Sequence, residues 1–170
     1  MDNPIHWHAV HVKPKHEKST AEILASKGFQ QFSPLYSCRR HWSDRVKTVE
    51  LPLFPGYVFC QFQKHERAAI LATPSIVSIL KFGPEPAIVD DSEIEAIRAA
   101  VHSDRPLQPW PYVPLGTTVR VTHGVLEGVT GTLVQERGCF RVVLNVSLVE
   151  RSVAVEVDRM DIQPVSMKRA

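Results

Sequence analysis

Residues 51–62 read LPLFPGYVFCQF, a run with four aromatic residues, two prolines and no formal charge. Its Pro55-Gly56 pair predicts a sharp turn, because proline restricts φ and glycine accepts a positive φ. The residues that follow predict a strand over 56–62. Strand alternation puts Val58, Cys60 and Phe62 on one face, which we predict to be core. For the opposite face, which carries Tyr57 and Phe59, both a buried and an exposed position stay open.

The residues around this run predict one compact α+β layer. Strands are expected at 6–12, on both sides of a polar turn at 42–45 within 32–51, and at 76–82. Three other segments have the composition and residue spacing of helices, and we expect helices at 17–28, 65–73 and 90–102. The order β-α-β-β-β-α-β-α favours an antiparallel sheet flanked by helices, and we assign residues 1–103 to this N-terminal domain.

Residues 104–114 interrupt this pattern with four prolines, at positions 106, 109, 111 and 114. Repeated proline removes backbone donors and stiffens the chain, so this segment is predicted to be a linker. A long loop within a single domain is the alternative. Residues 115–170 then show short β-branched runs separated by glycine turns. They predict a small all-β domain, an SH3-like barrel of five strands.

Composition restricts the class of protein. The chain has 170 residues, of which 44% are hydrophobic and 22% charged, with a net charge of +2. No apolar run is long enough to span a bilayer, and the N-terminus lacks the pattern of a secretory signal. Three widely spaced cysteines argue against a disulfide framework. We therefore expect a cytoplasmic protein that is a monomer and has no membrane partner.

The segment VRVTHGVLEGVTGTLV, residues 119–134, places Gly124, Gly128 and Gly131 between two expected strands. We interpret these glycines as structural, because glycine lets a backbone turn where a Cβ would clash. A dinucleotide-binding loop is the alternative, but that motif must open a helix, and strand residues follow here. The segment resembles a KOW motif, in which Gly128 occupies the most typical glycine position and Leu126 stands where phenylalanine is common.

Together with the first half, this segment makes the whole chain resemble the NusG family of transcription elongation factors. The resemblance rests on Trp7 in the first strand, on LFPGYVF, on KFGPEPAIV and on the KOW segment, and it covers about residues 5–165. PLFPGYVF and KFGPEPAIV are also similar to the specialised RfaH-type paralogues, which we favour over a housekeeping NusG.

The resemblance implies a binding site for RNA polymerase. In the family, an apolar groove holds the clamp helices of the β′ subunit, and the factor bridges the main channel, with the β subunit as a second contact. The bridge disfavours clamp opening, and so suppresses pausing or modulates termination by shifting a population. The residues expected to line this groove are His11, Phe54, Pro55, Tyr57, Phe59 and Phe82.

Basic residues cluster near two expected turns, with Trp42 and Tyr36 among them. Cations interleaved with aromatic rings suit single-stranded nucleic acid, and the family implies non-template DNA as the partner. A solvated hairpin tip is the alternative. The residues in question are Lys13, Lys15, His16, Arg39, Arg40, His41, Arg45 and Lys47.

Two other functions are kept open. A KOW-containing RNA-binding or ribosome-associated module would use only the second domain. A zinc site built from His8, His11, Cys38 and His41 is disfavoured, because His8 and His11 point to opposite faces of a strand. We expect no enzyme activity, metal or cofactor. For the KOW domain, the family implies the termination factor Rho or a small-subunit ribosomal protein. Some RfaH-type proteins fold this domain as two helices; here the strand pattern predicts β structure.

Overall fold

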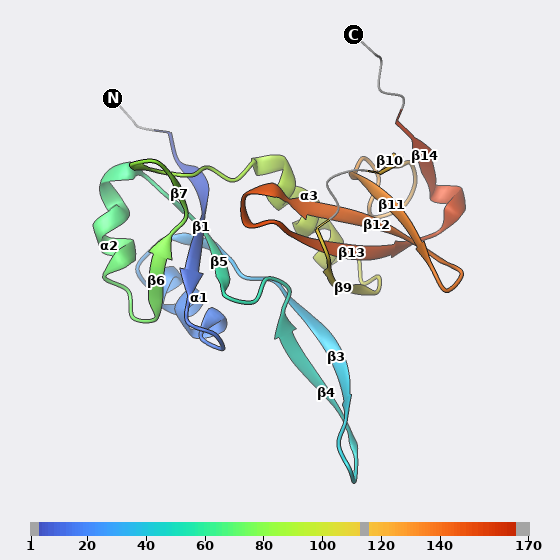
Figure 1. Ribbon diagram of the computed structural model, residues 1–170, viewed down its shortest axis with the longest axis horizontal. Helices are drawn as coiled ribbons and strands as arrows, with labels where there is room; N and C mark the ends of the chain where they lie inside the picture. The colour runs from blue at the N-terminus through green and yellow to red at the C-terminus, as the bar shows by residue number, and fades with distance from the viewer. Residues whose placement is uncertain (1–3, 113–115, 166–170) are drawn as a thin grey trace. The chain divides into compact units, whose positions relative to one another are not determined.

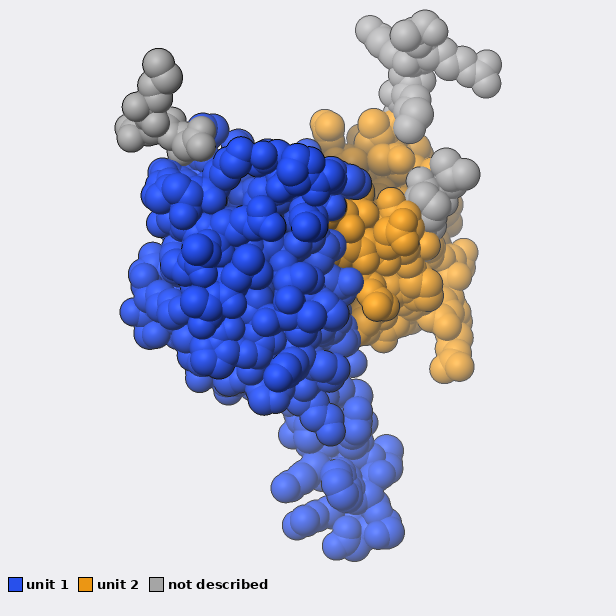
Figure 2. Space-filling model, turned by 60° about the vertical axis from the view of Figure 1, so that its left-hand side comes forward, with its two compact units in different colours: residues 1–91 blue, residues 92–170 orange. Residues whose placement is uncertain are grey.

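The computed structural model describes residues 4–112 and 116–165. The chain divides into two compact units, Met1–Asp91 and Ser92–Ala170, coloured separately in Figure 2. No helix among the described residues is both long and apolar enough to cross a membrane.

The first unit is built on a four-stranded antiparallel sheet with the strand order β2-β5-β1-β6 (Figure 1). Its central strands are β1 (His6–Val12) and β5 (Tyr57–Phe62), and its edges are β2 (Gln30–Phe32) and β6 (Ile76–Ile79). This arrangement confirms the predicted antiparallel sheet and both of its central strands.

One face of this sheet carries the main core of the unit, under α1 (Glu17–Ser26) and α2 (Arg67–Leu71), which the short helix η1 (Lys64–Glu66) precedes. The cluster consists of Val10, Val12, Ala21, Leu24, Val58, Cys60, Phe62, Ile70 and Ile79. The predicted core residues of β5 are therefore confirmed.

Two hairpins extend this unit. The longer one joins β3 (Leu35–His41) to β4 (Val46–Pro52), and its ribbon projects well away from the sheet in Figure 1. The shorter one joins β7 (Lys81–Phe82) to β8 (Glu85–Pro86). The polar turn predicted at 42–45 lies at the tip of the longer hairpin.

The second unit contains α3 (Asp91–His102) and a six-stranded antiparallel sheet ordered β14-β10-β11-β12-β13-β9. Its remaining elements are β9 (Leu107–Trp110), β10 (Thr118–Val121), β11 (Thr130–Glu136), β12 (Cys139–Val146), η2 (Ser147–Val149), β13 (Arg151–Val157), η3 (Arg159–Asp161) and β14 (Ile162–Pro164). The predicted all-β fold is thus confirmed, and a pair of long helices does not occur in the described part of this segment.

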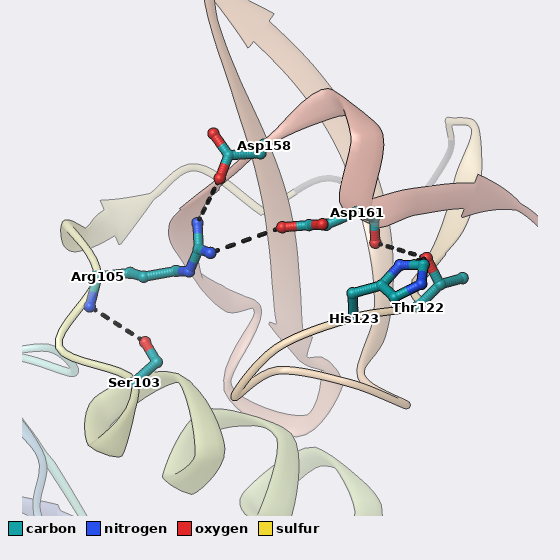
Figure 3. Close-up of polar contacts among 6 residues, drawn as sticks. All are labelled: Ser103, Arg105, Thr122, His123, Asp158 and Asp161. Atoms are coloured by element: carbon teal, nitrogen blue, oxygen red, sulfur yellow. Dashed lines mark hydrogen bonds and ion pairs between the residues drawn. The ribbon is translucent and has the colours of Figure 1, made fainter.

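The structure differs from the predicted linker over 104–114. Strand β9 lies inside that segment and pairs with β13, as a sixth strand beyond the predicted five. The guanidinium of Arg105 lies 3.5 Å from Asp158 Oδ2 and 3.7 Å from Asp161 Oδ2, next to η3 (Figure 3). The guanidinium of Arg141 lies 5.5 Å from the ring centre of Trp110. Cross-strand pairing and charge hold the segment in place up to residue 110; residues 113–115 lie outside the described residues.

Helix α3 also groups differently from the sequence-based division at residue 103. Apart from its first residue, it belongs to the second unit. Glu93 Oε1 accepts hydrogen bonds from Ser147 N at 3.1 Å and from Ser147 Oγ at 2.8 Å. At the other end of α3, Ser103 Oγ donates to Ala100 O at 2.7 Å and accepts from Arg105 N at 3.3 Å. These bonds join both ends of the helix to the segments around the β sheet.

The three glycines of the 119–134 segment serve two different purposes. Gly124 and Gly128 have φ values of +82° and +87°, which L-residues rarely adopt. Gly131 instead lies against β12: a Cβ there would come 2.5 Å from Val142 Cγ1 and 2.5 Å from the carbonyl oxygen of Val143. Gly131 is therefore required for close strand packing.

We expect Gly131→Ala to destabilise the β sheet of the second unit by about 2 kcal/mol, the usual cost of overpacking a filled core. Gly138→Ala is the control, because its φ is +81° but nothing lies within 4 Å of the added Cβ. It should cost about 1 kcal/mol through backbone strain alone. Hydrogen exchange at the amides of β12 measures both values, and an equal loss in the two variants would contradict the packing explanation.

Candidate functional site

The turn at residues 54–57 is fixed by two backbone hydrogen bonds and by the positive φ of Gly56. Tyr57 N donates to Phe54 O at 3.1 Å, and Gly56, with φ at +84°, occupies the position of a type II turn that favours glycine. Val12 N donates to Gly56 O at 2.9 Å. The predicted sharp turn is confirmed, and it is attached to the end of β1.

The buried carboxylate of Glu17 also stabilises this turn. Glu17, the first residue of α1, is 4% exposed and accepts a hydrogen bond from Gly56 N at 2.8 Å. A charged acceptor makes a stronger bond than a neutral one, and a buried turn amide would otherwise lack a partner. The sequence pattern did not indicate this role, because Glu17 looks like an ordinary acidic residue in the first turn of a helix.

His11, Pro55, Gly56 and Tyr57 form what we call the turn patch. His11 and Tyr57 are directly opposed across β1 and β5, and their ring centres lie 5.6 Å apart. Both are half-buried, whereas Pro55 is exposed. A Cβ on Gly56 would lie 3.7 Å from the His11 ring, so the turn packs on the imidazole. These side chains present an apolar and aromatic surface at one end of the sheet.

Other residues expected to line the groove lie elsewhere. Phe54 and Phe59 are 1% and 0% exposed, and their rings meet edge to face at 5.1 Å. They are buried because Phe59 shares its sheet face with Ala9, directly across from it, and packs near Phe32. This part of the aromatic run is core.

Phe82 is 75% exposed, yet it does not lie with the turn patch. Strand β6 passes His11 at Ser78, and Leu80 N bonds Ala9 O, so Phe82 lies further toward the Trp7 end of β1. Phe82 is four residues beyond Ser78, which at 3.3 Å per residue is about 13 Å along the strand direction from His11.

The predicted basic residues fall into two groups. Lys13, Lys15 and His16 are exposed in the loop before α1, where His16 Nδ1 lies 3.3 Å from Ser75 Oγ. The other five, all exposed, lie on the β3–β4 hairpin. The ion pairs seen within residues 4–112 and 116–165 are made by other cations: Lys64 with Glu85, Arg98 with Glu95, Arg105 with Asp158 and Asp161, and Arg141 with Glu136 and Glu156.

A pocket of about 360 Å³ lies at the base of the hairpin, and of the eight predicted basic residues only Lys15 lines it. Leu35, Leu51 and Pro52 give it an apolar wall, and Lys15 and Lys18 lie at the α1 side. Glu17 and Glu50 also line it, so the pocket is not uniformly basic.

The residues of the disfavoured zinc site are not brought together. His8 Nδ1 lies 2.8 Å from the carbonyl oxygen of Ala87, and its ring stacks 4.3 Å from that of Phe62. His11 faces the other side of the sheet. Among the described residues, no group of three potential ligands is placed to hold a metal ion. Burial, with the charge of Glu66 nearby, raises the pKa of the Cys60 thiol to about 12, so this thiol stays protonated at neutral pH.

Comparison with known proteins identifies this architecture. Residues 5–98 match the family model described as "Transcription termination factor nusG". The chain belongs to the NusG family. Among solved structures, NusG from Thermotoga maritima is similar over 96% of this chain and 98% of that chain, with 18% identity and a TM-score of 0.54. An MjSpt4:Spt5 complex covers 94% of this chain and 98% of its own, with 16% identity and a TM-score of 0.34.

Membership of the NusG family gives the chain a general role in transcription elongation or termination, and the family consists of transcription factors rather than enzymes. The Thermotoga structure supports the same fold for both halves of the chain, an α+β unit followed by a β-rich unit. The resemblance inferred from LFPGYVF, KFGPEPAIV and the KOW segment is thereby confirmed at the level of the family.

We expect Glu17→Ala to destabilise the first unit by about 2 kcal/mol, since it leaves the amide of Gly56 without its charged acceptor. Glu17→Gln keeps an oxygen at the same position and should lose less than half as much. Chemical unfolding of the full chain, with hydrogen exchange at Gly56 as the local measurement, compares the two. Equal losses would show that the carboxylate charge, and not the acceptor itself, is what stabilises the turn.

Burial lowers the pKa of His8 from its usual value of 6.5. The folded state therefore keeps His8 neutral where the unfolded state takes up a proton, so this contribution to stability is complete above pH 6.5. It is lost as the pH falls from there toward the lowered pKa. His8→Gln retains a donor for Ala87 and does not titrate, so its unfolding free energy should fall less between pH 7 and pH 5. An unchanged slope would rule out His8 as the source.

Proposed function

We propose that this NusG-family protein binds the clamp helices of RNA polymerase through the turn patch. The observation that carries the proposal is the accessible end of an otherwise buried aromatic sheet face. Tyr57 and His11 are half-buried and in ring contact, and Pro55 is exposed beside them. A rigid surface with aromatic anchors suits a helix that lies across it.

Preorganisation supports this assignment. Because Glu17 and Val12 hold Gly56 from both sides, the turn patch is ordered before a partner arrives. A preformed surface avoids part of the entropic cost of ordering side chains on binding. Phe54 and Phe59 serve the site by supporting the turn from the core, and exposed Phe82 is a separate, more distant contact in this proposal.

In this proposal the hairpin and the loop before α1 contact non-template DNA, and the bound factor stabilises the closed clamp. Closure of the clamp suppresses pausing and changes termination without any chemical step, through a shift in population. The likeness of PLFPGYVF and KFGPEPAIV to RfaH-type paralogues favours a specialised factor. In this proposal the factor acts in the cytoplasm as a monomer. A factor that bridges the main channel of the polymerase would also contact the β subunit.

The second unit is proposed to bind a second partner, either Rho or a small-subunit ribosomal protein. Supporting this is a groove of about 520 Å³ on its sheet, lined by Leu133, Phe140 and Ile162 among others. Arg159 lies over Phe140, with its guanidinium 5.9 Å from the ring centre. An apolar groove with an arginine at its edge is typical of a protein contact.

The test is binding of the full chain to an isolated fragment containing the clamp helices. Tyr57→Ala should weaken binding about 30-fold, the effect of removing an aromatic hot spot worth about 2 kcal/mol. Leu71→Ala on α2 is the control, because Leu71 is 40% exposed and lies outside the turn patch. Calorimetry gives the affinities, and circular dichroism checks folding.

Binding that is equally tight in Tyr57→Ala and in the unsubstituted chain would contradict the turn patch as the polymerase site. Full-chain binding to RNA or ribosomal components, with none to the clamp fragment, would support the alternative of an RNA-binding or ribosome-associated module. Pause lifetimes in transcription in vitro provide the functional measurement, and Tyr57→Ala should return them to the value without the factor.

A further inference from the structure

The register of the β3–β4 hairpin divides its side chains between two faces. Arg40 is directly opposite Lys47. Two positions further on, Trp42 N donates to Arg45 O at 2.8 Å and Arg45 N donates to Trp42 O at 3.3 Å, so these two residues are also opposed. Because side chains alternate with a period of two, all four lie on the same face, which we call the Trp42 face.

The opposite face has a different character. Its pairs are His41 with Val46, Arg39 with Thr48 and Ser37 with Glu50. That face therefore has Arg39 as its one permanent cation in the hairpin, and a carboxylate in the same row. The sequence places the hairpin's basic residues in one run, but the fold separates them.

The Trp42 face destabilises the hairpin when no ligand is bound. Like charges directly opposed across two strands destabilise a hairpin, and Arg40 faces Lys47 with Arg45 in the next pair. No carboxylate lies in this row of the hairpin. The indole of Trp42 is 61% exposed at the tip. An unsupported cluster of cations beside an exposed aromatic ring fits a polyanion that also has flat apolar groups.

We propose that the Trp42 face binds single-stranded DNA, with one base stacked on Trp42 and the adjoining phosphates held by Arg40, Arg45 and Lys47. Stacking and phosphate contacts are the two components of binding to single strands. The next pair on this face is Cys38 with Val49, and neither side chain offers a strong partner to a 2′-hydroxyl, which favours DNA over RNA. The inference rests on the proposed nucleic-acid contact and restricts it to one face.

Neighbouring arginines provide a matched test. Arg39 and Arg40 are adjacent, both exposed, and point to opposite faces, so Arg39→Ala and Arg40→Ala remove the same charge and the same atoms. The probe is a fluorescently labelled single strand of thymidines, bound to the full chain and followed by anisotropy over a range of salt concentrations. Arg40→Ala should weaken binding several-fold and reduce the salt slope by about 0.7, the value for one lost phosphate contact. Arg39→Ala should leave the slope unchanged.

Trp42 supplies an independent readout. Trp42→Ala should weaken binding about tenfold, whereas Trp42→Phe keeps a stacking ring and should lose much less. Of the other two tryptophans, Trp7 is 3% exposed and Trp110 is half-buried beside Arg141, so the part of the emission quenching that disappears in Trp42→Phe reports DNA contact at Trp42. These residues are exposed, and circular dichroism should show all the variants folded.

Equal losses in Arg39→Ala and Arg40→Ala would overturn binding through one face. Tighter binding of a uridine single strand than of the thymidine strand would overturn the choice of DNA. Absence of binding up to roughly 100 µM, the weak end of non-specific affinity, would overturn the inference as a whole. Clamp-helix binding, measured on the same variants, stays intact in each of these cases if the turn patch is the polymerase site, so failure of the proposed function is seen separately.

Discussion

The first unit depends on the hydrogen bond between the Glu17 carboxylate and the amide of Gly56. This contact ties the start of α1 to the turn that begins β5, and Val12 bonds the same glycine from the end of β1. The turn therefore sets the register in which His11 faces Tyr57 and Ala9 faces Phe59. A slip by one residue would exchange the two faces of β5, bringing Tyr57 into the core cluster and moving Val58 to the face of Ala9.

Local patterns in the sequence were enough to predict the central elements of this fold. Strand alternation identified Val58, Cys60 and Phe62 as core, and Pro55-Gly56 identified the turn. They could not decide the position of Phe54 and Phe59, because an aromatic residue suits both a groove and a core. That choice depends on what packs over the sheet face. Glu17 was missed for a related reason: its partner lies 39 residues away, and no local pattern reports such a contact.

Strand β9 shows a second limit of sequence reasoning. Pro106 and Pro109 predict a stiff linker, yet Pro109 lies opposite Val153 in a paired strand. The explanation is position, since β9 is at the end of the strand order and an edge strand tolerates a residue without an N–H. Arg105 and Trp110, which bring charge and ring contacts to the same segment, were not part of any recognisable local signal.

The charges of the hairpin show that strand register, and not composition alone, decides which side chains lie on one face. The sequence supplied a single group of cations with Trp42 among them, which fits any polyanion. Pairing of Arg40 with Lys47 turns that group into one strongly basic face and one nearly balanced face. An arm that carries charge on both sides would attract nucleic acid without orienting it. With the charge and the exposed indole on the same side, a bound strand would have one direction of approach, which would suit a factor that also binds the polymerase as proposed for the turn patch.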